Sequence, residues 1–262
     1  MGWLKFIYIF GAAGDSGAAV GAGLFAYYSV ISRVTSVIPA KAGTQKKRHL
    51  IDNLSFGSEY SNEQIEATLK KYNLKYKKFT DENKLIKTTA KLLAQNKIIG
   101  WFQGRCEFGP RALGNRSILC CPHPGTMKTK MNIIKLREQF RPFAGSILRN
   151  EVSEYFEVPN KNLWSPFMTF CFKVKKDKKK DLVAITHADD TCRIQTIDIN
   201  NGRYYLLIKK FYELTKIPCI LNTSFNLKGE PIIENPEQAI KDFLKTKMDC
   251  LVIGDFLVYK IQ

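Results

Sequence analysis

Short apolar runs alternate with amphipathic segments along most of this chain. The apolar runs predict strands at residues 98–102, 117–121, 143–148, 167–174, 193–197, 219–222 and 250–253. Helical spacing of apolar side chains predicts helices at residues 62–72, 82–96, 128–134, 204–215 and 236–245. Helices and strands that follow one another in this order predict an α/β fold with a mixed sheet.

The first 48 residues follow a different pattern. Residues 4–10 predict a strand, residues 11–17 a glycine-rich turn and residues 18–28 a helix of mostly small side chains. Residues 29–48 neither continue that helix nor begin a convincing strand, so we expect a flexible insertion there. The chain therefore divides into residues 1–28, a connecting region at 29–83 and a main domain at 84–262.

Charge and cysteine usage narrow the class of protein. The 41 Lys and Arg residues exceed the 24 Asp and Glu residues, and the resulting net charge of +17 fits an anionic partner such as a nucleotide, a phosphate ester or a nucleic acid. The seven cysteines include no C-x-x-C pair, which indicates reduced thiols of a cytoplasmic protein. The apolar start has no basic segment before it, which disfavours a secretory signal, and we expect no membrane contact.

The most informative stretch is residues 100–117, where a buried strand leads into a loop rich in glycine. The loop carries three arginines, Arg105, Arg111 and Arg116. Glycine lets a backbone approach a ligand closely, and a guanidinium group can bind phosphate or carboxylate oxygens through two parallel hydrogen bonds. We therefore predict an anion site, the alternative being a surface turn with solvated charges.

Two further polar clusters lie before or within predicted strands. Lys135 and Arg141 flank another basic residue just ahead of an apolar run, and they could hold a polyphosphate or form a solvated loop. His187 shares a ten-residue stretch with two aspartates and Arg193. A lone histidine is more often structural than catalytic, but the polar neighbours of His187 keep both a structural and a catalytic role open.

Two clusters follow predicted strands directly. Asn222, Ser224 and Asn226 end a buried strand, where open α/β sheets bind ligands, although an Asn/Ser turn would have the same composition. Asp15 in the glycine-rich turn could be a metal ligand or, more commonly, a helix cap. The sequence contains no Walker A motif and no zinc-ligand spacing, so dispersed side chains would have to hold any nucleotide.

Four ordered motifs together resemble the C-terminal half of O-carbamoyltransferases of the nodulation-protein U and cephalosporin-carbamoylating type. The motifs are residues 104–117, 140–144, 186–196 and 221–231. The resemblance runs from about residue 84 to residue 259, and residues 11–28 match the end of the family's preceding domain. It implies a YrdC-like mixed twisted sheet flanked by helices, preceded by a remnant of an actin-like (ASKHA) domain.

The resemblance also implies a reaction. In that family the YrdC-like domain makes carbamoyl-adenylate from ATP and carbamoyl phosphate, and the actin-like domain transfers the carbamoyl group to a hydroxyl acceptor. The implied catalytic residues are Lys135, Arg141, Arg111 and His187, and the implied residues around ATP and Mg²⁺ are Arg105, Arg193, Asn222, Ser224 and Asn226. Both substrates are polyanions, which agrees with the clustered cations.

The chain departs from the family pattern at two places. Asp190 stands where the family usually has glycine, which adds a negative charge beside the expected phosphates. Asp15 matches an aspartate that binds iron or another divalent metal in the complete actin-like domain, but the family's histidine pair is missing. We therefore expect transfer to need a separately encoded N-terminal lobe. The alternatives are a basic RNA- or DNA-binding module, which the lack of aromatic-basic alternation disfavours, and an inactive remnant of a split gene.

Overall fold

The computed structural model of this chain describes residues 9–12, 14–35 and 51–260, with the backbone alone at residues 15, 16 and 28–35. The strand expected at residues 4–10 lies mostly outside these ranges, as does much of the expected insertion. The first helix, α1 (Asp15–Thr35), is longer than the sequence predicted. Residues 24–35 contain neither glycine nor proline, so nothing stops the helix at residue 28 where we expected it to break.

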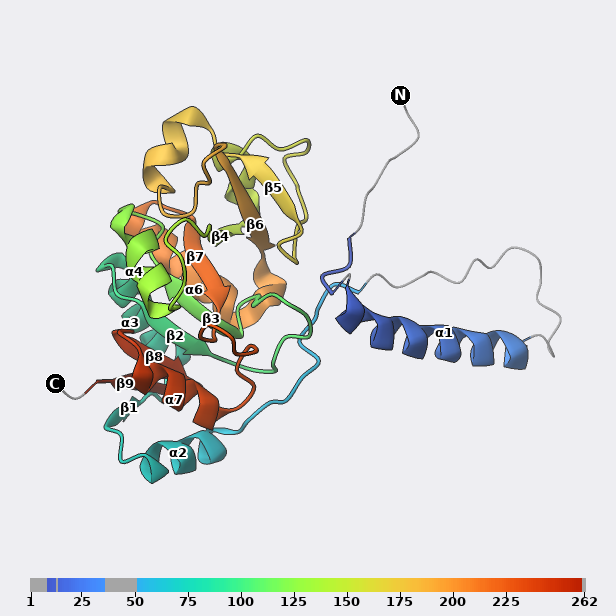
Figure 1. Ribbon diagram of the computed structural model, residues 1–262, viewed down its shortest axis with the longest axis horizontal. Coiled ribbons are helices and arrows are strands. Elements are labelled where there is room, and N and C mark those ends of the chain that lie inside the picture. The colour runs from blue at the N-terminus through green and yellow to red at the C-terminus, as the bar shows by residue number, and fades with distance from the viewer. Residues whose placement is uncertain (1–8, 13, 36–50, 261–262) are drawn as a thin grey trace.

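The main body is built on a nine-stranded mixed sheet, as the alternation of elements predicted (Figure 1). The strand order is β1-β9-β8-β2-β3-β7-β4-β6-β5. Two neighbouring pairs, β2 with β8 and β4 with β6, are parallel, and the other neighbouring pairs are antiparallel. The strands are β1 (Tyr76–Lys78), β2 (Ile99–Phe102), β3 (Arg116–Cys120), β4 (Ala144–Leu148), β5 (Phe170–Lys173), β6 (Thr191–Ile197), β7 (Cys219–Ser224), β8 (Cys250–Ile253) and β9 (Phe256–Tyr259).

Helices cover both faces of this sheet. The α-helices of the body are α2 (Asn62–Lys71), α3 (Glu82–Ala94), α4 (Thr126–Ile134), α5 (Val152–Tyr155), α6 (Gly202–Thr215) and α7 (Pro236–Lys245), and short 3₁₀ helices are η1 (Arg149–Glu151), η2 (Lys176–Asp181) and η3 (Ile199–Asn201). On one face α3 and α6 pack through Leu85 and Phe211 onto Trp101. On the other face α2, α4 and α7 form the second core layer with strand residues such as Ile118 and Leu221.

Local sequence signals explain where several helices begin. Ser61 caps α2 and Asn235 caps α7, each within a reciprocal capping box. Pro236 occupies the first turn of α7, where its missing N–H costs no hydrogen bond. These caps lie immediately before the apolar spacing that predicted both helices.

The sequence analysis missed strands β1 and β9. Strand β1 has only three residues, and two of them are exposed lysines, so it shows no apolar run. Strand β9 forms a hairpin with β8 across Gly254 and Asp255, where Gly254 has φ +53°. The glycine-aspartate pair was the available signal for this turn.

Helix α1 extends away from the sheet (Figure 1). The turn before it packs closely on the body: a Cβ added to Gly11 would lie 2.4 Å from Leu54 Cδ1 and 2.8 Å from Phe167 Cβ. Farther along α1, Phe25 and Tyr27 are 77% and 60% exposed. No helix in the described ranges combines the length and the apolarity needed to cross a bilayer.

Candidate anion site

The loop between β2 and β3 is organised around the buried carboxylate of Glu107. Its Oε1 accepts hydrogen bonds from the backbone N–H groups of Leu113 and Asn115, both at 2.7 Å. The N–H of Arg116 donates to both carboxylate oxygens, at 3.1 and 3.2 Å. Burial raises the pKa of Glu107, and the three backbone donors oppose that rise. One side chain therefore fixes the path of the whole loop.

Arg116 has a structural role that the sequence did not reveal. Its guanidinium is buried, donates to the carbonyl oxygens of Gln103 and Ser58 at 2.7 and 3.1 Å, and stacks on the Phe102 ring at 3.6 Å. Its donors are thus used by the protein itself. Of the three loop arginines, Arg111 and Arg105 remain on the surface.

The loop lies over the sheet face that α3 and α6 cover farther along. Three side chains of that face donate to successive loop carbonyls: Asn222 to Ala112 at 3.2 Å, Gln195 to Leu113 at 2.8 Å and Trp101 to Gly114 at 2.7 Å. These hydrogen bonds hold residues 112–114 above strands β7, β6 and β2. The loop consequently brings Arg111 to the edge of the same face.

Lys135, the C-cap of α4, reaches the end of β7. Its ammonium donates to Ser224 O at 2.7 Å, Ser224 Oγ at 3.2 Å and Asn226 Oδ1 at 2.5 Å. All three acceptors are uncharged. Burial, with a smaller contribution from Arg137, lowers the pKa of Lys135 to about 7. The structure thus joins three sequence-predicted residues in one hydrogen-bonded group.

Arg137 is a member of this site that the sequence analysis passed over as the basic residue between Lys135 and Arg141. Its Nε donates to Asn132 Oδ1 at 2.8 Å, and its guanidinium stacks on the Phe143 ring at 4.3 Å. Burial and the charges of Arg141 and Arg193 lower its pKa to about 10. The sequence did contain a signal for Arg137, since this second basic residue lies two positions after Lys135.

Three more arginines extend the positive charge. Arg141 is exposed and pairs with Glu138 at 2.8 Å. Arg193 on β6 is half-buried, and burial together with the charge of Arg111 lowers its pKa. Like-charge repulsion therefore acts between Arg141 and Arg137 and between Arg137 and Arg193. It also acts between Arg193 and Arg111. We call the group of Lys135, Arg137, Arg141, Arg193, Arg111, Asn222, Ser224 and Asn226 the cationic site.

Three buried polar atoms at or beside this site have no hydrogen-bond partner among the residues that the structure describes. They are Asn222 Oδ1, Ser117 Oγ and Arg193 Nε. Ser117 is paired in register with Ser224 on β7, and Ala144 of β4 is paired with both Asn222 and Arg193. A buried polar atom without a partner costs free energy unless water, an ion or a ligand satisfies it. Arg193 Nε and Ser117 Oγ can donate to an anionic ligand, whereas Asn222 Oδ1 only accepts and suits a hydroxyl, a water or a cation.

The remaining sequence-predicted residues lie in other surroundings. His187 has both ring nitrogens engaged, with Phe143 O at 3.1 Å and Thr191 Oγ1 at 3.2 Å. Arg105 is exposed and donates weakly to Phe56 O at 3.4 Å. These contacts tie neighbouring loops together, and a catalytic role for His187 and a ligand role for Arg105 stay predictions.

Two acidic residues complete the account of the predicted positions. Asp190, which replaces the family's usual glycine, has φ +66° and pairs with Lys179 at 2.7 Å. The positive φ explains why glycine suits this position, and the ion pair partly neutralises the added charge. The side chain of Asp15 lies outside the described residues, and within the described part of the chain no three potential metal ligands form a group.

Comparisons with known proteins agree with the motifs. The family model described as Carbamoyltransferase C-terminus matches residues 90–260. Nodulation protein NolO of Bradyrhizobium diazoefficiens is 39% identical over 259 residues, which cover 97% of this chain and 44% of that protein. The 3'-hydroxymethylcephem-O-carbamoyltransferase of Amycolatopsis lactamdurans is 31% identical over 164 residues, covering 62% of this chain and 31% of that enzyme.

The chain therefore spans less than half the length of these two relatives. Among solved structures, full-length HypF in the phosphate- and nucleotide-bound form matches with a TM-score of 0.46 and 21% identity, over 70% of this chain and 22% of that chain. The sequence similarity carries the assignment. This chain belongs to the carbamoyltransferase family and contains its C-terminal domain.

Proposed function

We propose that the cationic site forms carbamoyl-adenylate from ATP and carbamoyl phosphate. The observation that carries the proposal is the coupled row of cations beside buried polar atoms that lack partners. Polyanionic substrates would repay the cost of holding these like charges close together. Because the chain belongs to the carbamoyltransferase family, we take the transferred group to be carbamoyl.

The proposed reaction consumes one water. Water cleaves carbamoyl phosphate to carbamate and inorganic phosphate, and a carbamate oxygen then attacks the α-phosphorus of ATP. The bond between the α- and β-phosphates breaks, and pyrophosphate leaves with its electron pair. Cations held in place before the reaction would stabilise the charge that develops on the leaving phosphates.

Each residue of the cationic site has a proposed task. Lys135 is proposed to exchange one of its three hydrogen bonds to Ser224 and Asn226 for a phosphate oxygen, and its low pKa makes its charge responsive to that of the ligand. Arg137, fixed by its stacking on Phe143, offers its remaining donors to a second phosphate group. The backbone of residues 112–114 closes the opposite wall, where Asn222 and Gln195 hold it.

Magnesium is proposed to enter with ATP and not in a cage of protein ligands. Mg²⁺ usually keeps several waters and binds substrate phosphates together with few protein oxygens. Among the described residues, the buried Asn222 Oδ1 and Ser117 Oγ are neutral oxygens near the site without a hydrogen-bond partner. Iron or another divalent metal would belong to the actin-like lobe and not to this site.

The transfer step is proposed to need an actin-like lobe, whether encoded separately or not. Helix α1 exposes Phe25 and Tyr27. An apolar surface of this kind commonly packs against another domain. The hydroxyl acceptor of the transfer is not specified by the cationic site.

Pyrophosphate release tests the adenylation step directly. The purified chain is incubated with ATP, Mg²⁺ and carbamoyl phosphate, and release is compared with reactions that lack one substrate. We expect release that requires both substrates and disappears in Lys135→Met, while Lys91→Met on the exposed side of α3 keeps it. A folded protein that neither binds ATP nor releases pyrophosphate would refute the proposal, as would full activity of Lys135→Met.

A further inference from the structure

The proposed adenylation leaves one buried carboxyl group without a task. Asp242 lies on the core side of α7 with Ala239, Ile240 and Phe243, where helical spacing calls for an apolar residue. It is 3% exposed, and its Oδ2 has no hydrogen-bond partner among the residues that the structure describes. A buried carboxyl group is costly unless a proton neutralises it or a nearby cation balances its charge.

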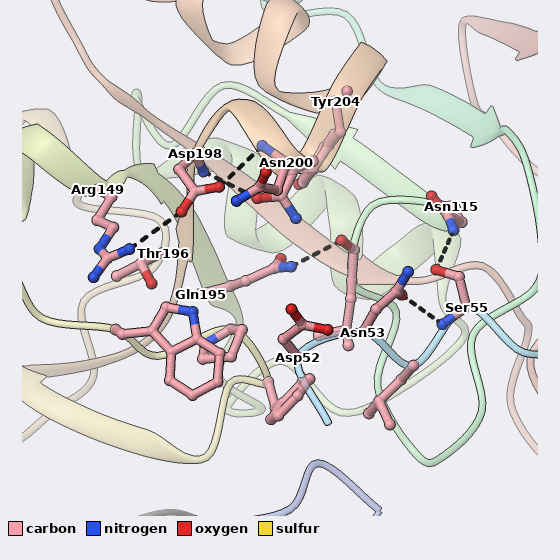
Figure 2. A pocket seen from close by; sticks show the side chains of 17 residues that line it. Asp52, Asn53, Ser55, Asn115, Arg149, Gln195, Thr196, Asp198, Asn200 and Tyr204 are labelled. Carbon is pink, nitrogen blue, oxygen red and sulfur yellow. Dashed lines mark hydrogen bonds and ion pairs between the residues drawn. The ribbon is translucent and has the colours of Figure 1, made fainter. Parts of the chain in front are cut away.

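Asp198 shows how a carboxylate is satisfied elsewhere in this protein. Its Oδ2 lies 3.3 Å from Arg149 Nη1 (Figure 2), and its Oδ1 accepts a hydrogen bond from the backbone N–H of Asn200 at 3.0 Å. Asp198 is half-buried, whereas Asp242 is buried. The more deeply buried of these two carboxyl groups is therefore the one with an unpartnered oxygen.

The charged side chains that act on Asp242 differ in their burial. They come from three parts of the chain: Glu230 after β7, Lys245 on α7 itself and Lys135 at the end of α4. Glu230 and Lys245 are exposed, whereas Lys135 is only 5% exposed. Water and salt screen exposed charges more strongly than buried ones. Lys135 is therefore the buried cation available to balance this carboxylate.

The backbones that carry Lys135 and Asp242 are fixed relative to each other. Ile134 precedes Lys135 and Phe243 follows Asp242, and both apolar side chains belong to one hydrophobic core cluster. The ammonium is anchored separately, because it donates to Asn226 Oδ1 at 2.5 Å. The fold thus sets the separation between the ammonium and the carboxyl group.

Asp242 opposes the factors that favour a neutral Lys135. Burial, followed by the charge of Arg137, lowers the pKa of Lys135 to about 7, and the charge of Asp242 acts in the opposite direction. Burial, followed by the charge of Glu230, raises the pKa of Asp242 to about 6. The carboxylate is therefore ionised where Lys135 titrates, and its effect is lost as the pH falls through about 6.

We infer that Asp242 is a positioning residue of the cationic site, a counter-charge that keeps Lys135 protonated for its encounter with substrate phosphates. Asp242 does not touch the phosphates in this scheme and acts only through Lys135. The mutual effect of the two charges exists without any reaction, whereas its benefit to catalysis rests on the proposed function.

The charge of Lys135 can be read without substrate. NMR of the full chain with ¹³C at the lysine ε-carbons follows each ammonium through a pH titration, and Lys135→Met identifies the resonance. Asp242→Asn should lower the charged fraction of Lys135 near pH 7 by about threefold, and Asp242→Glu should restore most of it. Glu237→Gln in the first turn of α7 is the control and should leave that fraction unchanged. An unchanged fraction in folded Asp242→Asn would overturn the inference.

A reciprocal measurement keeps the inference testable if Asp242→Asn does not fold. Coupling between two charges is mutual, so Lys135→Met should raise the pKa of Asp242 further. The ¹³C resonance of the Asp242 carboxyl carbon should then report a protonated fraction near pH 7 that is about threefold larger in the variant. Identical titrations of Asp242 in both proteins would also overturn the inference.

Pyrophosphate release tests the benefit to catalysis. Asp242→Asn should be about threefold slower than the wild type near pH 7.5, and the two should agree near pH 5.5, where Asp242 is protonated in the wild type. A variant that is equally slowed at both pH values has only a structural defect, which would overturn the positioning role. If the wild type releases no pyrophosphate while NMR shows the coupled charges, the adenylation is refuted and the counter-charge is supported.

Discussion

The ammonium nitrogen of Lys135 lies 2.7 Å from the carbonyl oxygen of Ser224, which is 89 residues further along the chain. The contact joins the end of α4 to the end of β7. It places a buried cation among uncharged acceptors, and the resulting pKa of about 7 is far below the usual lysine value. Lys135 should therefore change charge near neutral pH, and two predictions depend on this.

The first prediction concerns the stability of the protein without ligand. The folded protein disfavours protonated Lys135, so below pH 7 it carries the full penalty, which declines as pH rises from about 7 towards the unfolded value of 10.5. Burial raises the pKa of Asp242 to about 6, so this carboxyl group is already ionised over most of that range. Urea unfolding of the wild type at several pH values should show a free energy of unfolding that rises with pH above about 7, because the penalty from Lys135 declines. Lys135→Met should flatten that rise, and an unchanged slope would contradict the assignment.

The second prediction concerns proton uptake. A bound triphosphate favours the charged ammonium and should raise the pKa of Lys135 towards its ordinary range. ATP binding near pH 8 should then take up a fraction of a proton. Isothermal titration calorimetry in two buffers of different ionisation enthalpy measures this uptake. Lys135→Met should abolish it, whereas equal heats in both buffers for the wild type would exclude Lys135 as the phosphate ligand.

Arg137 gives the third prediction. A lysine at this position keeps the charge but loses both the planar stacking on Phe143 and the fixed bond to Asn132. We expect Arg137→Lys to weaken ATP binding by about tenfold and Arg137→Met to weaken it further. Arg203→Lys on α6 serves as the control outside the cationic site. Wild-type affinity in Arg137→Lys would show that the guanidinium geometry does not matter.

The sequence predicted the long elements of the fold because their apolar spacing is local information. Helix α7 shows this well, since its cap, its proline and its buried residues all lie within a few positions of one another. Strand β1 escaped prediction because its pairing with β9 depends on residues about 180 positions away, as in Tyr76 with Val258. The length of α1 was missed for a different reason, because β-branched residues after position 29 lower helix propensity without preventing a helix.

Site residues were predictable by type but not by role. Arg111 and Arg116 lie five positions apart in a glycine-rich loop and look alike in sequence, yet Arg111 is exposed and Arg116 is buried. The backbone N–H of Arg116 donates to Glu107, and its guanidinium stacks on Phe102. Only the tertiary arrangement separates them. The same holds for Gln195, whose link between the loop and two strands no local pattern records.

The fourth prediction concerns the glycine at the end of the loop. Gly114 has φ +114°, and an added Cβ would lie 2.3 Å from Tyr204 Cδ1. Gly114→Ala therefore introduces both backbone strain and a clash with a buried ring, and should destabilise the protein by about 2–4 kcal/mol. Gly104→Ala tests strain alone, because Gly104 has φ +49° and open space around its Cβ position. Urea unfolding should show a clearly larger loss for Gly114→Ala, and equal losses would mean that the clash is relieved at no cost.

The last prediction addresses Glu107, which the sequence marked only as an acidic residue among arginines. Its carboxylate accepts three backbone hydrogen bonds, so Glu107→Gln replaces one acceptor oxygen with an NH₂ group that faces backbone donors. Leaving buried donors unsatisfied should cost about 1–3 kcal/mol, measured by urea unfolding, with Glu59→Gln as the exposed control. Because the same hydrogen bonds position residues 112–115, the variant should release less pyrophosphate than the wild type even at temperatures where it is still folded. Normal stability together with normal release would show that the loop does not need this carboxylate.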